Sequence, residues 1–165
     1  MSGWTESGLY AGVLYKSLAV PTATSSPDWT ATSNYMFLTN NSDTPDFTQA
    51  AASAIYATTN EVHDSSAWPA GGVACSALAS GSTSISPALN ASGSKVLSWT
   101  AGNVSVASTT LASPGTYGGY FYANSLSPKY KIIGIYFGGT GYITTAGVFA
   151  ITWSGGTIAT ITCAT

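Results

Sequence analysis

Large and small side chains alternate near the end of the chain. Phe149, Ile151 and Trp153 occupy every second position, and small side chains stand between them. A period of two is typical of a β-strand with one buried face. The next residues, 154–157, include two glycines, which adopt positive φ angles readily and favour tight turns. We therefore predict a hairpin in which residues 158–163 form the partner strand.

Other short runs of apolar and β-branched residues predict further strands. Each run is bounded by Gly, Pro, Asn or Ser clusters of the kind that form turns. A series of short strands separated by such turns is typical of an antiparallel β-sandwich or jelly roll, so the fold is expected to be mainly β. The expected strands are residues 34–39, 78–89, 96–99, 104–111, 117–123 and 130–137, with a short one at 142–145.

Two stretches have a helical pattern. Apolar residues from Leu9 to Leu18 recur at three- and four-residue spacing, which predicts a short amphipathic helix over residues 8–18 that ends before Pro21. An alanine-rich run at 46–57 predicts one short internal helix.

The chain is divided into an arm and a single domain. Residues 1–33 combine the first helix with a Pro-, Ser- and Thr-rich segment, and residues 34–165 hold the expected strands. The length of 165 residues suits one domain. No apolar run approaches the roughly 18 residues of a membrane helix, and the first twelve residues lack the basic region of a signal peptide. No membrane partner is therefore expected.

Charged residues are scarce. They make up 6% of the chain, with four lysines, no arginine, six acidic residues and a net charge of −2, whereas a typical soluble domain has about 25%. No basic patch can be built, so nucleic acid is not an expected partner. A surface poor in charge is weakly protected against association. We expect a protein that is covered by neighbours in a large assembly, with a lone soluble domain as the alternative.

Candidate catalytic and metal-binding groups are few. Ser92 and Lys95 match the S-x-x-K pattern, but a glycine inside it and a strand after it favour a hairpin turn. The Glu-Val-His-Asp sequence at 61–64 lacks the second histidine of an ordinary zinc site. The Asn and Asp residues at 41–46 resemble calcium ligands, but a proline among them and Asx-turn chemistry favour a turn. We therefore assign no catalytic, metal or cofactor residue and expect no enzyme.

The two cysteines, Cys75 and Cys163, lie far apart in the sequence. Without a secretion signal, buried free thiols are expected, and a cross-strand disulfide is the alternative.

Several aromatic and leucine side chains of irregular or helical segments are candidates for an interface. Tryptophan is favoured at protein contacts, although packing beneath a loop is the alternative for the three tryptophans outside the expected strands. The candidate interface residues are Trp4, Leu9, Tyr10, Leu14, Trp29 and Trp68.

An ordered set of short motifs resembles a family of tailed-bacteriophage virion proteins. The strand at 34–39 is followed by Thr-Pro-Asp-Phe, then Asn-Glu-Val, then Trp-Pro-Ala-Gly-Gly-Val. Similar segments of that family come in the same order, and the resemblance covers residues 8–163. The matching segments are 9–18, 34–39, 44–47, 60–62, 68–73, 96–99, 132–139 and 147–153.

The resemblance implies a non-enzymatic structural protein of a phage particle. It would be a capsid decoration or minor capsid protein that binds and stabilises the outer head lattice, in trimers. Its partners would be the major capsid protein or other virion proteins. Its location would be the virion, assembled in the cytoplasm of the bacterial host. A tail or adaptor component is the alternative within phage particles. A carbohydrate-binding β-sandwich and a hydrolase are the alternatives outside them.

Overall fold

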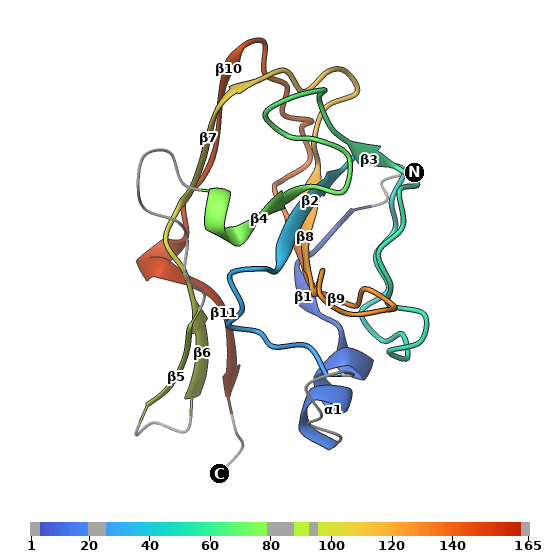
Figure 1. Cartoon of the computed structure of the whole chain (residues 1–165), viewed down its shortest axis with the longest axis vertical. Helices are drawn as coiled ribbons and strands as arrows, with labels where there is room; N and C mark the ends of the chain where they lie inside the picture. Colours follow the sequence, from blue (N-terminus) through green and yellow to red (C-terminus); the bar gives the residue numbers. More distant parts are fainter. Residues whose placement is uncertain (1–3, 20–25, 79–87, 93–95, 163–165) are drawn as a thin grey trace.

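A computed structural model describes residues 4–19, 26–78, 88–92 and 96–162 (Figure 1). The fold is mainly β, with antiparallel sheets, one helix and two short 3-10 turns, η1 (Cys75–Ala77) and η2 (Ser154–Gly156). The helix and strands are β1 (Gly8–Leu9), α1 (Ala11–Ala19), β2 (Tyr35–Thr39), β3 (Glu61–Val62), β4 (Val73–Ala74), β5 (Ala88–Ser92), β6 (Val96–Thr100), β7 (Val104–Thr109), β8 (Gly118–Tyr122), β9 (Lys131–Tyr136), β10 (Gly147–Ile151) and β11 (Thr157–Thr162).

One layer is a six-stranded antiparallel sheet. Its order is β1-β9-β8-β2-β3, and β4 also pairs with β2. The central strand β8 is buried along its whole length, because both faces of the sheet are covered.

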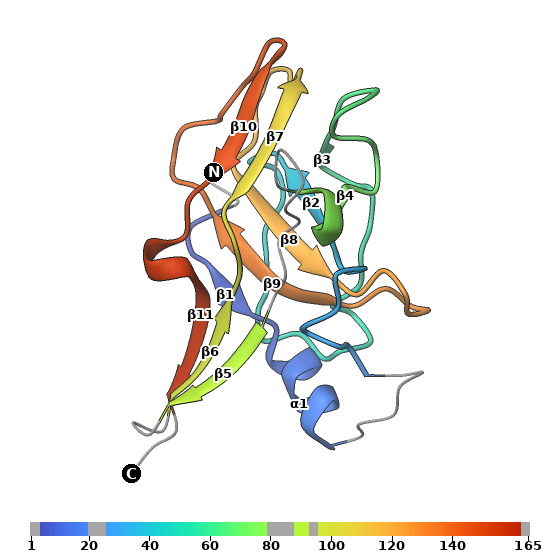
Figure 2. The same ribbon diagram turned by 60° about the vertical axis from the view of Figure 1, so that its left-hand side comes forward.

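The second layer is a long ribbon of strands that bends (Figure 2). At one end β6 lies between β5 and β11, and at the other β7 pairs with β10. The core lies between this ribbon and the six-stranded sheet: the ring of Trp99 on β6 meets Phe121 on β8 edge-on, at 5.4 Å between ring centroids. The two layers form the expected sandwich-like arrangement.

The expected hairpin at 154–157 is not formed, and that prediction was wrong. Both glycines have positive φ, 61° at Gly155 and 72° at Gly156, but the chain does not reverse. β10 pairs with β7 and β11 pairs with β6. Gly156 N donates to Trp153 O at 3.1 Å, and Ala101 N donates to Gly156 O at 3.0 Å. The glycines thus form a short turn where the ribbon bends from one small sheet into the next.

The alanine-rich segment at 46–57 is not a helix, and that prediction was also wrong. Its backbone bonds elsewhere: Ala11 N donates to Phe47 O at 3.0 Å, and Lys131 N donates to Ala54 O at 2.8 Å. These bonds hold the segment as a series of turns against the start of α1 and against β9. Tertiary pairing therefore overrides the helix propensity of the alanines.

Residues assigned to an N-terminal arm form part of the core. Gly8–Leu9 pairs with β9, so the helix begins at Ala11 rather than at residue 8. The side chains of Trp4, Tyr10, Val13 and Trp29 belong to the single hydrophobic cluster of the described residues. The described part of the segment is thus integrated with the β domain.

The remaining strand predictions agree with the structure within a few residues. The exceptions concern two segments. Residues 142–145 form a single bridge, between Tyr142 and Thr116, rather than a strand. β5 begins at Ala88 and ends at Ser92, three residues beyond the end of the expected strand at 78–89, while 79–87 lie outside the described residues.

Candidate functional site

Four of the six candidate interface residues are buried within the chain. Trp4, Tyr10, Trp29 and Trp68 are almost completely inaccessible to solvent, so the expectation that they form a contact surface was wrong. Leu9 and Leu14 are half-buried. The six residues do not converge: they lie on the outer face of the six-stranded sheet, beneath β10, and beside α1.

Trp4 and Tyr10 pack on the outer face of the six-stranded sheet. Their ring centroids lie 4.9 and 6.1 Å from that of Tyr120 on β8. Trp4 Nε1 donates to Thr39 Oγ1 at 3.0 Å. A Cβ atom at Gly118 would lie 2.7 Å from the Trp4 ring. A glycine inside a strand often marks such a close approach, and this signal points to the burial of Trp4.

A group of ionisable side chains lies beside these rings. The Tyr120 hydroxyl donates to the Asp43 carboxylate. Lys131 Nζ lies 4.6 Å from the centroid of the Tyr120 ring and 5.2 Å from that of Tyr10. Burial raises the pKa of both tyrosines and lowers the pKa of Lys131. The arrangement holds the loop around Asp43 and the N-terminal segment against the sheet.

A second group has the same construction on the neighbouring part of this face. Tyr56 and Tyr122 stack at 4.8 Å, and Lys129 Nζ lies 5.6 and 5.8 Å from their centroids. The Tyr56 hydroxyl donates to Glu61 Oε2 at 2.9 Å, and Gly71 N donates to Glu61 Oε1 at 2.7 Å. Glu61 therefore links β3 to the loop that leads into β4.

The acidic residues of the 61–64 motif hold loops rather than a ligand. Asp64 accepts hydrogen bonds from Trp68 N at 2.8 Å and Thr110 N at 2.9 Å. Burial acts to raise the pKa of Asp64, but the backbone N–H donors outweigh it and lower the pKa below its ordinary value. Within the described ranges, no three His, Cys, Asp or Glu side chains are placed to hold a metal ion. Ser92 ends β5, and the rest of the S-x-x-K pattern lies outside the described residues.

Buried tyrosines and the buried thiol raise the proton affinity of the folded state. Burial raises the pKa of Tyr56 to about 12 and that of Cys75 to about 12. It also raises the pKa of Tyr10, Tyr120 and Tyr122. In an unfolded chain these groups ionise near pH ~8.5 for cysteine and ~10 for tyrosine.

We predict that the fold loses stability as the pH rises above about 8.5, and faster above about 10. In that range the folded state binds more protons than the unfolded state. The contribution is therefore complete below pH ~8.5 and is lost as the pH rises through the folded pKa values. The lowered pKa of Lys131 changes the pH dependence of stability in the opposite direction, but it is a single group, whereas four tyrosines and Cys75 have raised pKa values. Urea unfolding across the alkaline range measures the slope, and Tyr56→Phe should make it shallower; a flat profile would contradict the prediction.

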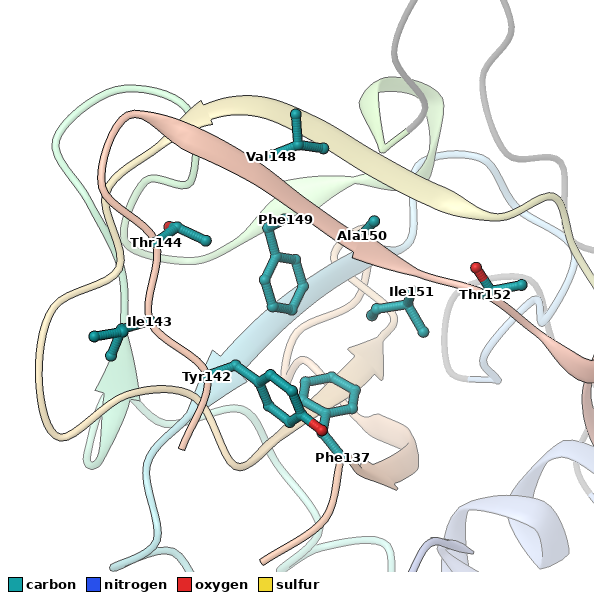
Figure 3. A pocket seen from close by; sticks show the side chains of 9 residues that line it. All are labelled: Phe137, Tyr142, Ile143, Thr144, Val148, Phe149, Ala150, Ile151 and Thr152. Atoms are coloured by element: carbon teal, nitrogen blue, oxygen red, sulfur yellow. The ribbon is translucent and has the colours of Figure 1, made fainter. Parts of the chain in front are cut away.

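An open apolar groove runs beside β10, and we call it the β10 groove (Figure 3). Its volume is about 440 Å³. Phe149 and Ile151 point toward Phe137 and Tyr142 across it. Tyr142, Ile143 and Val148 are 50, 63 and 59% exposed. The lining residues are Phe137, Tyr142, Ile143, Thr144 and the segment 148–152.

A second, smaller hollow of about 240 Å³ lies beside α1 and brings together two candidate interface residues, Leu14 and Trp29. Trp29 Nε1 donates to Ser17 Oγ of the helix at 3.0 Å. Tyr15 and Leu18 on the same helix are 72 and 73% exposed. We call this the α1 hollow. Its floor is buried and its helix side chains are accessible.

The exposed residues of the β10 groove were not among the interface residues expected from the sequence. A signal was present, because no charged residue follows Lys131 and the stretch 132–165 is apolar or neutral polar throughout. Cys75 is a buried free thiol, as expected, and Cys163 lies outside the described residues.

No helix in the described part of the chain has the length and apolar character needed to cross a membrane. Comparisons with protein-family models, with curated proteins and with solved structures find no match to this chain.

Proposed function

We propose that this chain is a non-enzymatic structural component of a bacteriophage particle. In this proposal it is a capsid decoration or minor capsid protein that associates with itself, binds the outer lattice of the head and stabilises it. Its partners are the major capsid protein or other virion proteins. The proposal rests on the motif resemblance together with the distribution of charge and apolar surface in the fold.

One observation carries most weight: most of the few charged side chains make contacts with other groups of the same chain. Five of the six acidic side chains accept hydrogen bonds from neighbouring groups of the same chain, and they are Asp28, Asp43, Asp46, Glu61 and Asp64. The described lysines, Lys16, Lys129 and Lys131, each lie over a tyrosine ring.

Apolar side chains are exposed on two parts of the surface. The β10 groove and the exposed side chains of α1 have the character of contact surfaces, since contiguous apolar patches on soluble proteins mark interaction sites. A protein built in this way holds partners by covered area rather than by chemistry at a site. Binding through buried contact area is compatible with a protein that holds neighbouring capsid subunits together.

The carbohydrate-binding alternative is less well supported than the structural one. A sugar-binding face on a β-sandwich would need exposed tryptophans or tyrosines in a row. All five tryptophans are buried. The strongly exposed aromatic side chains of the described residues are Tyr15, which lies on α1, and Tyr142, which lies in the connection between β9 and β10.

The proposal is tested on particles purified from the bacterial strain in which this gene is expressed. Quantitative mass spectrometry should find the chain in many copies per particle, and immunogold labelling should place it on the head surface. The purified chain should also bind heads from which it has been stripped, and raise the temperature at which they break. Labelling confined to the tail would support the adaptor alternative. Absence of the chain from purified particles would exclude both.

A further inference from the structure

We propose that the free edge of β10 is a self-association surface, on which β10 of a second copy pairs antiparallel across a two-fold axis. The inference rests on the proposal that this chain works in an assembly, but it names the surface and the partner independently of the particle.

β10 has one strand neighbour in the described part of the chain. Its register with β7 joins Phe149 to Val106 and Ile151 to Val104. The opposite edge of β7 is covered in part, because Ser105 N donates to Leu78 O at 2.7 Å. Along 148–151, the described residues provide no backbone hydrogen bond to any strand other than β7. The two-stranded sheet of β7 and β10 therefore has one open edge, which is the edge of β10 that faces away from β7.

This open edge lacks the usual protection. Soluble proteins shield exposed strand edges with lysine, proline or inward-pointing charge. The stretch 132–165 contains neither a charged residue nor a proline. β10 and β7 also project at one end of the molecule (Figures 1 and 2), where another chain can reach them. An edge of this kind is suited to strand addition.

The side chains along the edge are compatible with an identical strand. Val148, Ala150 and Thr152 alternate with the inward-facing Phe149 and Ile151 and are exposed. They are small or β-branched, so two backbones can approach at the spacing of a sheet. No ionisable side chain other than Tyr142 lines the β10 groove, so two copies meet without repulsion between like charges.

The occupant is a second copy because the surface is complementary to itself. The patch holds a hollow, the β10 groove, beside projecting apolar side chains, Ile143 and Val148. A neutral surface offers no charge by which to select a different partner. A two-fold contact brings the same patch of each copy together, so the apolar side chains of one copy meet those of the other. A stable pair needs about 800 Å² from each partner, roughly a tenth of the 8075 Å² surface of this chain.

Strand pairing of this type has two-fold symmetry and so predicts an even number of copies. The motif resemblance instead implies trimers. Sedimentation velocity of the purified full chain separates the two: a mass of two copies, or a multiple of two, is expected. A monomer at every concentration, or an assembly of three, overturns this inference. Either result leaves the capsid proposal to be decided by the particle experiments.

Charge substitutions locate the contact. Val148→Lys and Ala150→Lys should each raise the dissociation constant of the pair at least about tenfold, since they place like charges opposite each other across the axis. Leu18→Lys, at a similarly exposed position on α1, is the matched control and should leave it unchanged. Circular dichroism and thermal melting confirm that each variant is folded. Dissociation by Leu18→Lys but not by the two β10 variants would overturn the proposal.

Single cysteines test the symmetry directly in a chain that carries Cys163→Ser. Under mild oxidation, the variants Val148→Cys, Ala150→Cys and Thr152→Cys should form disulfides between two copies, each alone or in mixtures of two variants. A two-fold axis through position 148, 150 or 152 brings that position close to its own equivalent, within the ~4.4–6.8 Å between Cα atoms that a disulfide requires. An axis through position 149 or 151 instead places two neighbouring members of this set opposite each other. Leu18→Cys should stay monomeric on a non-reducing gel. No bridge at the three β10 positions, alone or in mixtures, would overturn the two-fold arrangement.

Discussion

A Gly72→Ala variant should lose more than about 3 kcal/mol of unfolding free energy. Gly72 has φ of +80°, a region that costs an L-residue roughly 1–2 kcal/mol. A Cβ atom there would also lie 2.1 Å from the backbone oxygen of Met36. Met36 on β2 pairs with Val73 on β4, so relief of this overlap would separate the two strands. Urea unfolding with an unchanged slope measures the loss.

Gly155→Ala is the matched control for backbone strain alone. Gly155 has φ of +61°, and an added Cβ would meet no atom within 4 Å. Its substitution should therefore cost only the ~1–2 kcal/mol of the left-handed conformation. Equal losses for the two variants would show that the close approach of residue 72 to β2 contributes nothing.

Trp68→Ala should cost about 3–5 kcal/mol, as expected when a large, fully buried aromatic side chain is truncated. The Trp68 ring packs edge-on against Phe149 of β10, at 5.3 Å between centroids. It thus fixes the loop between β3 and β4, residues 63–72, to the ribbon. Truncation leaves a cavity between these two segments, and the midpoint of urea unfolding should fall accordingly.

Two further variants test whether loss of packing causes the effect of Trp68→Ala. Trp68→Phe should be less harmful than Trp68→Ala, because it keeps an aromatic ring and removes an indole N–H that has no acceptor among the described residues. Tyr15→Ala, on the exposed side of α1, should change stability by no more than about 0.5 kcal/mol. If Trp68→Ala unfolded no more easily than Tyr15→Ala, packing at Trp68 would not hold the loop.

Most strands could be predicted from the sequence because their signal is local. Alternation at 149–153 correctly assigned Phe149 and Trp153 to the buried face. Alternation does not identify the partner of a strand, however. The two glycines at 155–156 correctly signalled positive φ, but whether the chain reverses there depends on Ala101, which follows β6 and bonds to Gly156 from far away in the sequence. The hairpin prediction failed for this reason.

Burial of the tryptophans could not be predicted from their own surroundings in the sequence. Trp4 lies in an irregular segment, and its pocket is made by Gly118 and Tyr120, far along the chain. The same applies to Trp29, which packs on Trp99. The β10 groove could be predicted in part, because its residues belong to a long stretch of the sequence without charge. Its shape could not be predicted, because it depends on how β10 lies beside residues 137–144.

The lysines that lie over tyrosine rings also govern how the protein responds to proteases. Trypsin cleaves after lysine and arginine, and the chain has four lysines and no arginine. Lys16, Lys129 and Lys131 are held against Tyr130, Tyr56 and Tyr120, so cleavage after these three lysines should be slow in the folded protein. Once the protein is unfolded, trypsin still finds no lysine or arginine within residues 132–165, so this region remains in one long peptide stretch without charged side chains that is poorly suited to detection. A protease that cuts at aromatic residues would divide this region into many shorter peptides and reveal the protein in a purified particle.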